Sequence, residues 1–337
     1  MFHRKCNTMP VKAKRKYIIL TILAIVAVLT VVVNQISVYP FMWTFRGLMS
    51  FTSEQGDPGN YEVYIQEVVS SEKISVSVEG YPDAYVTFYS PEEQKQGEYL
   101  PVILYIHGGG WSAGNAEAIA WYAKLLASNG YVVANVDYSL APEHPYPAST
   151  VQLVTVLNYL YENAAEYGIN EDKIFVGGNS AGAHLASQLG ALVSNTDYAE
   201  DVGVCVNVPR KCVRGLLLFN GVYNFDTVKE CNFPFFTQLA WSYTGQKNFE
   251  AYARLDELST AKHVTEDYPA TFITVGDADP LRTQTKELID VFEDNSVNYR
   301  AILWDDTGAK LGHDYVYEMD TREAQIAYEA VLEFLAF

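Results

Sequence analysis

One serine lies in a sequence setting that suits a nucleophile. The pentapeptide Gly178-Asn179-Ser180-Ala181-Gly182 follows an apolar run at 173–177 that predicts a buried strand, and it precedes a run at 184–192 that predicts a helix. Such a strand-to-helix turn needs glycine at both ends, because a side chain there would collide with the neighbouring strand and helix, and it pushes the serine hydroxyl outwards. We therefore predict a nucleophile elbow centred on Ser180.

A serine hydroxyl needs a base that removes its proton and an acid that orients the base. His313 follows the last predicted strand, in the loop Gly312-His313-Asp314-Tyr315, where its side chain can reach the carboxyl edge of the sheet. The chain order serine, acid, histidine also favours it, so His313 is the predicted base. The remaining histidines are His3, His107, His144, His184 and His263.

The acid is predicted in the turn that follows the strand at 271–275. Asp279 precedes Pro280, which holds it out of helical geometry while the next helix begins behind it. Asp277 is the competitor, and one of these two aspartates can serve only to cap the helix. Asp305 and Asp306, which follow the next strand, are further candidates.

Attack on an ester places negative charge on the carbonyl oxygen, and losing one N–H donor to it costs about 2.7 to 4 kcal/mol of barrier. Ala181, next after the serine, is one predicted donor. Gly108 and Gly109, in the run HGGG at 107–110, are the others, because glycine lets the backbone approach the oxyanion. A flexible loop or a phosphate cradle is the alternative for this run, but no Lys-Ser or Lys-Thr follows it and its spacing does not fit a dinucleotide fingerprint. The sequence has no zincin motif and no Cys-x-x-Cys, so we predict no metal and no cofactor.

The predicted elements bring these residues to one edge of a sheet. From residue 102, apolar runs typical of strands covered on both faces alternate with helical patterns, and the connections are short. This pattern predicts an α/β fold with a doubly wound, mostly parallel sheet, preceded by antiparallel strands at 62–69, 73–79 and 84–89. The later strands are predicted at 102–107, 131–136, 173–177, 214–220, 271–275 and 299–304, and the helices at 116–128, 151–167, 184–192, 281–295 and 321–337.

Two segments, 195–213 and 221–269, interrupt this alternation. The second is rich in aromatic residues, and we predict that it forms a small aromatic cap over the active site. Its aromatic residues include Phe233, Phe235, Phe236, Trp241 and Tyr243.

The amino-terminal segment predicts a membrane anchor. Residues 17–33 carry no charge and follow four basic residues, and the apolar stretch up to 38 covers about 30 Å as a helix, which is the hydrocarbon thickness of a bilayer. A cleaved signal peptide is the rival, although the run is longer than a typical h-region and no small-x-small site follows. Since basic residues stay cytoplasmic, the large domain should be extracytoplasmic. The predicted parts are a cytoplasmic basic tail at 1–16, a transmembrane signal anchor at 17–38, a juxtamembrane linker at 39–60 and a catalytic domain at 61–337.

The charge of the chain limits the kinds of substrate it can attract, and its cysteine content limits the disulfides it can form. The net charge is -18, and residues 1–33 hold six basic residues and no acid, which leaves 17 basic against 41 acidic residues in the rest. Such a surface repels nucleic acid and anionic membranes, so we expect a neutral or cationic small substrate; acidity for solubility alone is the alternative.

The four cysteines are too few for a disulfide scaffold. A Cys205–Cys212 bridge and reduced thiols, including Cys231, both remain open.

Five motifs together resemble the hormone-sensitive-lipase-like carboxylesterases. They are HGGG at 107–110, DYSLAPEHPYPA at 137–148, the elbow, the turn Asp279-Pro280-Leu281 and His313, and they cover the chain from about residue 101 to residue 337. The resemblance implies an α/β-hydrolase fold and hydrolysis of short-acyl esters without a cofactor. It also implies a triad of Ser180, Asp279 and His313 and an oxyanion hole of Gly108, Gly109 and Ala181.

The chain departs from that family in three places. Asn179 stands where an acid usually precedes the serine, Thr283 stands where a second acid commonly follows the Asp-Pro-Leu turn, and the interrupting segments differ from a typical lipase cap. In related secreted esterases the substrate is often an acetylated sugar. We expect a membrane-anchored extracytoplasmic serine esterase for small neutral esters. A serine peptidase with the same triad and a non-catalytic interaction protein on the same fold are the alternatives.

Overall fold

The computed structural model describes residues 20–21, 32–52, 65, 67–95, 97–305 and 307–336. The predicted basic tail and most of the predicted anchor at 17–38 lie outside these residues. Within the described ranges, no helix is both long enough and apolar enough to span a bilayer. The anchor at 17–38 therefore stays a prediction.

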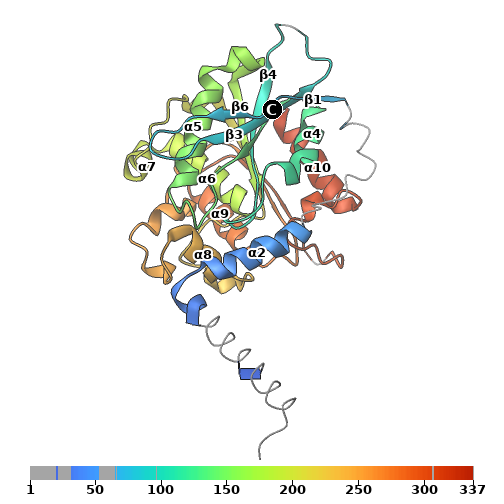
Figure 1. The fold of residues 1–337 in the computed structure, drawn as a ribbon. Helices are drawn as coiled ribbons and strands as arrows, with labels where there is room; N and C mark the ends of the chain where they lie inside the picture. Colours follow the sequence, from blue (N-terminus) through green and yellow to red (C-terminus); the bar gives the residue numbers. More distant parts are fainter. Residues whose placement is uncertain are drawn as a thin grey trace, which may run out of the picture.

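A nine-stranded sheet forms the centre of the described chain (Figure 1). Its strand order is β1-β3-β5-β4-β6-β7-β8-β9, with β2 also paired to β3. Strands β4 to β9 pair in parallel, and β3 runs antiparallel to β5. The strands are β1 (Val68–Ser70), β2 (Ile74–Val76), β3 (Ala84–Pro91), β4 (Leu100–Ile106), β5 (Val132–Asp137), β6 (Ile169–Asn179), β7 (Val213–Phe219), β8 (Thr271–Val275) and β9 (Tyr299–Leu303).

The opening strands are antiparallel as predicted, but β1 and β2 are much shorter than the predicted strands. Both pair with the same edge of β3, with Val69 opposite Ser90 and Ser75 opposite Tyr85. Between them Ser71 stays bonded to Phe88, which donates its N–H to the serine hydroxyl at 3.0 Å. A side chain there replaces a backbone partner, so the edge strand is broken into two short pieces.

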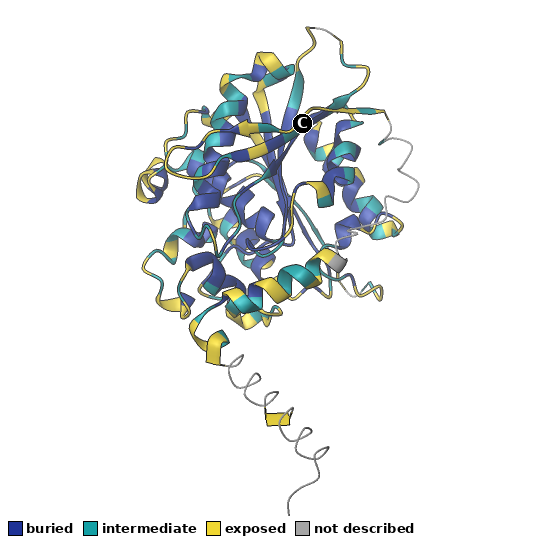
Figure 2. Ribbon diagram, viewed as in Figure 1, coloured by how far each residue is buried: buried dark blue, intermediate teal, exposed yellow. Residues whose placement is uncertain are grey.

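Helices cover both faces of this sheet, and the strands between them are buried (Figures 1 and 2). One face packs against α4 (Ala120–Ala127) and α10 (Arg322–Leu335), and the other against α5 (Ala148–Glu162), α6 (Ala181–Ser194) and α9 (Arg282–Asp294). In β4, Ile103 and Tyr105 face the first set, while Leu104 and Ile106 face the second. Burial on both faces explains why this strand is apolar without alternation.

The chain changes direction at the neighbouring strands β4 and β6. It passes from β4 through α4 to β5 on one side and from β6 through α6 to β7 on the other. Ligands of open α/β sheets bind in the crevice outside the carboxyl ends of such strands. The glycine run follows β4 and the elbow follows β6, so the topology brings the two together.

Two helices from distant parts of the sequence lie against each other beside this crevice, α2 (Tyr39–Thr52) and α8 (Phe236–Thr244) (Figure 1). Helix α8 belongs to the excursion at 221–269, which covers the site as predicted. A Cβ atom on Gly110 would lie 2.8 Å from Leu239 of α8, and the Phe233 ring lies 4.9 Å from the His313 ring. Residues 39–52 fall in the predicted juxtamembrane linker, whose apolar part at 41–51 could lie along the membrane or pack on the domain; they form a helix that packs on the domain. A further helix, α7 (Thr196–Val202), lies in the segment at 195–213.

Candidate active site

Ser180 occupies a strained turn between β6 and α6. Its backbone has φ 53° and ψ -119°, a combination that residues other than glycine rarely adopt. Its N–H donates to the carbonyl of Phe219 at 2.8 Å, which ties the turn to β7. A Cβ atom on Gly178 or Gly182 would lie 2.4 Å or 2.0 Å from the carbonyl oxygen of Ile106. Both glycines are therefore required for the elbow to approach β4.

The structure brings together the three side chains predicted as a triad. His313 Nε2 lies 2.9 Å from Ser180 Oγ, and His313 Nδ1 lies 2.9 Å from Asp279 Oδ2. The Asp279 side chain is fully buried, and its Oδ1 accepts the N–H of Leu281 at 2.8 Å. In this geometry the imidazole can take the serine proton while the carboxylate fixes its tautomer and stabilises the imidazolium.

The other candidate acids lie elsewhere. Asp277 accepts the N–H and the hydroxyl of Thr307 at 3.0 and 2.8 Å and the N–H of Leu311 at 2.7 Å, so it holds the loop that precedes His313. Asp305 pairs with Arg282. Asp306 lies outside the described residues. Asp279 rather than Asp277 thus contacts the histidine.

His184, on α6, is a neutral structural residue. Its Nδ1 accepts the indole N–H of Trp111 at 3.0 Å, so its Nε2 carries the proton and donates to the carbonyl of Leu258 at 2.9 Å. Burial lowers the pKa of His184 to about 4. The ring therefore fastens the end of the glycine run to α6 and to the cap without titrating near neutrality.

His107 begins the glycine run and stabilises it. Its ring is buried, stacks on Tyr138 at 4.4 Å and lies with Nδ1 2.7 Å from the carbonyl oxygen of Gly108. Burial lowers the pKa of His107, so this ring is neutral as well. The Tyr138 hydroxyl donates to the His107 carbonyl at 3.0 Å, which joins the segment at 137–148 to the run.

The structure corrects the oxyanion prediction at Gly108. Its N–H donates to Asn179 Oδ1 at 3.0 Å and is not free to meet an oxyanion. Among the residues that the structure describes, the N–H groups of Gly109, Gly110 and Ala181 have no hydrogen-bond acceptor. The free donors are therefore the predicted Gly109 and Ala181 together with Gly110. Nothing in the sequence of the glycine run indicates that one of its N–H groups donates to a side chain of the neighbouring strand β6.

Asp314 lies beside the triad and was not predicted as a site residue. Its Oδ2 lies 3.9 Å from His313 Nε2, and its Oδ1 accepts the side-chain amides of Asn179 at 3.0 Å and Asn220 at 3.4 Å. Burial lowers the pKa of His313, but the charges of Asp314 and Asp279 outweigh it and raise that pKa to about 9. Two features of the sequence could have indicated a role for Asp314: it directly follows His313, and Asn179 stands where an acid usually precedes the serine.

Helix α2 lines one side of a cavity of about 240 Å³ beside the glycine run, to which it contributes Met49 while the run contributes Gly109. Arg46 holds the helix there. Its guanidinium donates to the carbonyls of Ser112 at 2.6 Å and Ala141 at 2.7 Å and forms a two-pronged ion pair with Glu143. Helix α2 is thus attached directly to the loops that surround the site.

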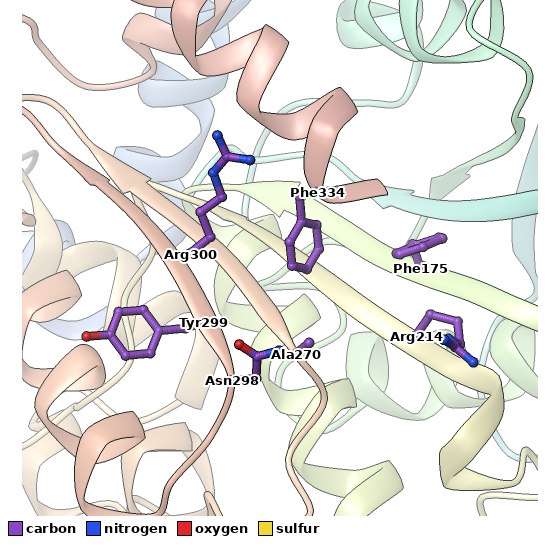
Figure 3. A pocket seen from close by; sticks show the side chains of 7 residues that line it. All are labelled: Phe175, Arg214, Ala270, Asn298, Tyr299, Arg300 and Phe334. Carbon is purple, nitrogen blue, oxygen red and sulfur yellow. The ribbon is translucent and has the colours of Figure 1, made fainter. Parts of the chain in front are cut away.

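A larger cavity, of about 420 Å³, lies at the opposite end of the strands (Figure 3). Arg214 and Tyr299, which line it, stand at the amino ends of β7 and β9, whereas Ser180 follows the carboxyl end of β6. This cavity is therefore separate from the candidate site. Its lining residues are Phe175, Arg214, Ala270, Asn298, Tyr299, Arg300 and Phe334.

The three cysteines of the described domain are free thiols, so the Cys205–Cys212 bridge is not formed. The Cys212 sulfur is buried and lies 3.4 Å from Asp172, while Cys205 is exposed and lies 3.4 Å from Asn207. In the described part of the chain, no group of three or more His, Cys, Asp or Glu side chains is arranged to hold a metal ion.

Comparison with known proteins assigns the chain to a family. The sequence model of the BD-FAE family matches residues 86–290. Carboxylesterase NlhH of Mycobacterium tuberculosis is 31% identical over 227 residues, which are 63% of this chain and 66% of the relative. An acetyl esterase of Salmonella paratyphi A is 31% identical over 215 residues, which are 60% of this chain and 61% of the relative. The chain thus spans less than two thirds of the length of either relative.

A solved structure supports the fold. The crystal structure of esterase B from Lactobacillus rhamnosis superposes with a TM-score of 0.74 at 21% identity, over 89% of this chain and 95% of that one. At this level of identity the similarity concerns the fold, which is the α/β-hydrolase fold predicted from the motifs.

Proposed function

Because the chain belongs to the BD-FAE family, a family of α/β-hydrolase carboxylesterases, we propose that it is a serine carboxylesterase for small neutral esters with short acyl groups. One observation carries this proposal: the continuous hydrogen-bonded path from Ser180 through His313 to Asp279. The names of the two sequence relatives, a carboxylesterase and an acetyl esterase, support ester substrates and a small acyl group. Acetylated carbohydrates are neutral esters of this kind and suit the acidic domain.

The proposed mechanism has two steps. His313 takes the proton of Ser180 as the hydroxyl oxygen attacks the ester carbonyl, and the N–H groups of Gly109, Gly110 and Ala181 bind the resulting oxyanion. The imidazolium then gives its proton to the leaving alcohol, and the acyl group remains on the serine. A water molecule, deprotonated by the same imidazole, attacks the acyl-enzyme, and the serine is regenerated with release of the acid.

The acyl chain length tests this substrate class. We expect kcat/KM to be highest for p-nitrophenyl acetate and butyrate and to fall at least about tenfold for the dodecanoate, because Leu239 and Phe233 of the cap lie over the glycine run and the base. An aminoacyl p-nitroanilide serves as the peptidase control. Faster turnover of the anilide than of the acetate would favour a serine peptidase, and a preference for long chains would contradict the short-acyl assignment.

We further propose that residues 17–38 anchor the protein in a membrane with the catalytic domain on the extracytoplasmic side. The support is the charge-free run and the basic residues before it. The full-length chain should remain in the membrane fraction after an alkaline carbonate wash, and protease added outside intact cells or spheroplasts should digest the domain. Release by carbonate would contradict the anchor. A domain protected until the cells are opened would contradict the orientation.

A further inference from the structure

Asp314 links the proposed base to the loop that carries the oxyanion donors. We propose that Asp314 is a positioning residue for the reaction: one carboxylate oxygen orients Asn179, which holds the glycine run through Gly108, and the other faces the His313 nitrogen that serves Ser180. This inference rests on the proposed esterase function and adds a fourth side chain to its site.

The first part of the inference is the fixed orientation of Asn179. Its amide is buried, donates from Nδ2 to Asp314 and accepts at Oδ1 from the N–H of Gly108. If the amide were turned over, its NH2 group would face the Gly108 N–H and its oxygen would face the carboxylate, and both bonds would be lost. The acceptor at Asp314 therefore decides which end of Asn179 meets the glycine run. With the Gly108 N–H held in this way, the next two amides of the run are left for the oxyanion.

The carboxylate itself is held in place and is not a mobile surface group. Amides from the carboxyl ends of two neighbouring strands donate to it, Asn179 as the last residue of β6 and Asn220 directly after β7. The Asp314 backbone has φ 64°, in the left-handed region that aspartate tolerates better than most residues, and its side chain is 23% exposed. A carboxylate fixed by two strand ends is suited to positioning the groups around it.

The second part of the inference concerns charge around His313. Two carboxylates face its ring, Asp279 at Nδ1 and Asp314 on the side of Nε2, and the neighbouring Phe233 ring is uncharged. The two carboxylates stabilise the imidazolium form of His313, so most of the imidazole becomes neutral only at alkaline pH. Burial raises the pKa of four further groups that interact with these aspartates, which keeps them neutral at pH 7. These groups are Tyr223 and Cys231 near Asp279 and Tyr105 and Tyr317 near Asp314.

The substitution Asp314→Asn in the full-length chain tests the charge. In the wild type, kcat/KM for p-nitrophenyl acetate should rise with pH through a midpoint near 9, the value to which the pKa of His313 is raised. Removing the negative charge destabilises the imidazolium, so the midpoint should move to lower pH by about 1 to 3 units. An NMR titration of the His313 ring reports the same change without relying on activity. A midpoint and a ring titration that both stay at the wild-type value would overturn this part.

The substitution Asp314→Ala tests the positioning, with Asp314→Asn as its matched control. Alanine removes the acceptor of the Asn179 amide, whereas the Oδ1 of an asparagine at position 314 can still accept that bond. We expect D314A to lower the high-pH plateau of kcat/KM by about tenfold, and D314N to keep the plateau within about threefold of the wild type while its midpoint is low. A D314A plateau equal to that of D314N, with both proteins folded by circular dichroism, would overturn the positioning role. Retained hydrolysis in S180A would instead overturn the proposed function, and the NMR titration would still decide the effect of Asp314 on His313.

Discussion

The substitution Ser180→Ala is expected to abolish ester hydrolysis, with kcat for p-nitrophenyl acetate reduced by about 10⁶-fold. Only one atom is removed, but it is the oxygen that lies 2.9 Å from His313 Nε2. The base and the free amides of the glycine run remain, so any residual rate comes from direct attack by water with the oxyanion stabilised. Steady-state kinetics with purified protein measures the loss, and circular dichroism checks that the fold is kept.

Ser194→Ala is the matched control for this variant. Ser194 lies at the end of the same helix, and its hydroxyl donates to the carbonyl of Gly190 at 2.8 Å, far along α6 from the elbow. We expect its kcat/KM to stay within about twofold of the wild type, as for substitutions away from a site. Substantial activity in S180A, together with an intact fold, would remove Ser180 from the mechanism.

The substitution Asp279→Asn is expected to lower kcat by about 10⁴-fold. The carboxylate accepts two bonds, one on each oxygen, from Leu281 N–H and from the imidazole. An asparagine has a single side-chain oxygen, so it cannot accept both in the same way. If its NH2 group faces the imidazole, Nδ1 must accept and Nε2 carries the proton, which is the wrong tautomer for a base toward Ser180. The pH dependence of the remaining activity and the rate at saturation measure the loss.

Asp277→Asn is the matched control for Asp279→Asn, because it makes the same chemical change two residues away in the same turn. Asp277 bonds to Thr307 and Leu311 and not to the imidazole, so its variant should lose no more than about tenfold in kcat through a looser loop. If D277N lost far more activity than D279N, the assignment of the acid would be reversed.

Much of the fold could be predicted because its central strands are buried on both faces. Such strands are continuous apolar runs, and β8 has the predicted bounds of 271–275. The opening strands were predicted less well. β1 and β2 lie at the sheet edge, where a serine side chain breaks the ladder, and an edge strand has a weak apolar pattern.

The site was predictable where chain order and turn chemistry define it, and not where it depends on packing between strands. Ser180, Asp279 and His313 each follow a strand, and parallel strands bring their carboxyl ends to one edge. Which glycine amide remains free depends on Asn179, which reaches across from the neighbouring strand. The role of Asp314 depends on the same contact. A contact between side chains of neighbouring strands leaves no periodic pattern in the sequence, so neither feature could be predicted.

Covalent trapping of the nucleophile tests the central claim most directly. An ester-mimicking alkyl phosphonate with a p-nitrophenol leaving group should inactivate the full-length protein and add one phosphonyl group per chain, and peptide mass spectrometry should place that group on Ser180. The same reagent should leave S180A unmodified. Loss of activity with the group on another residue, or full labelling of S180A, would contradict the account.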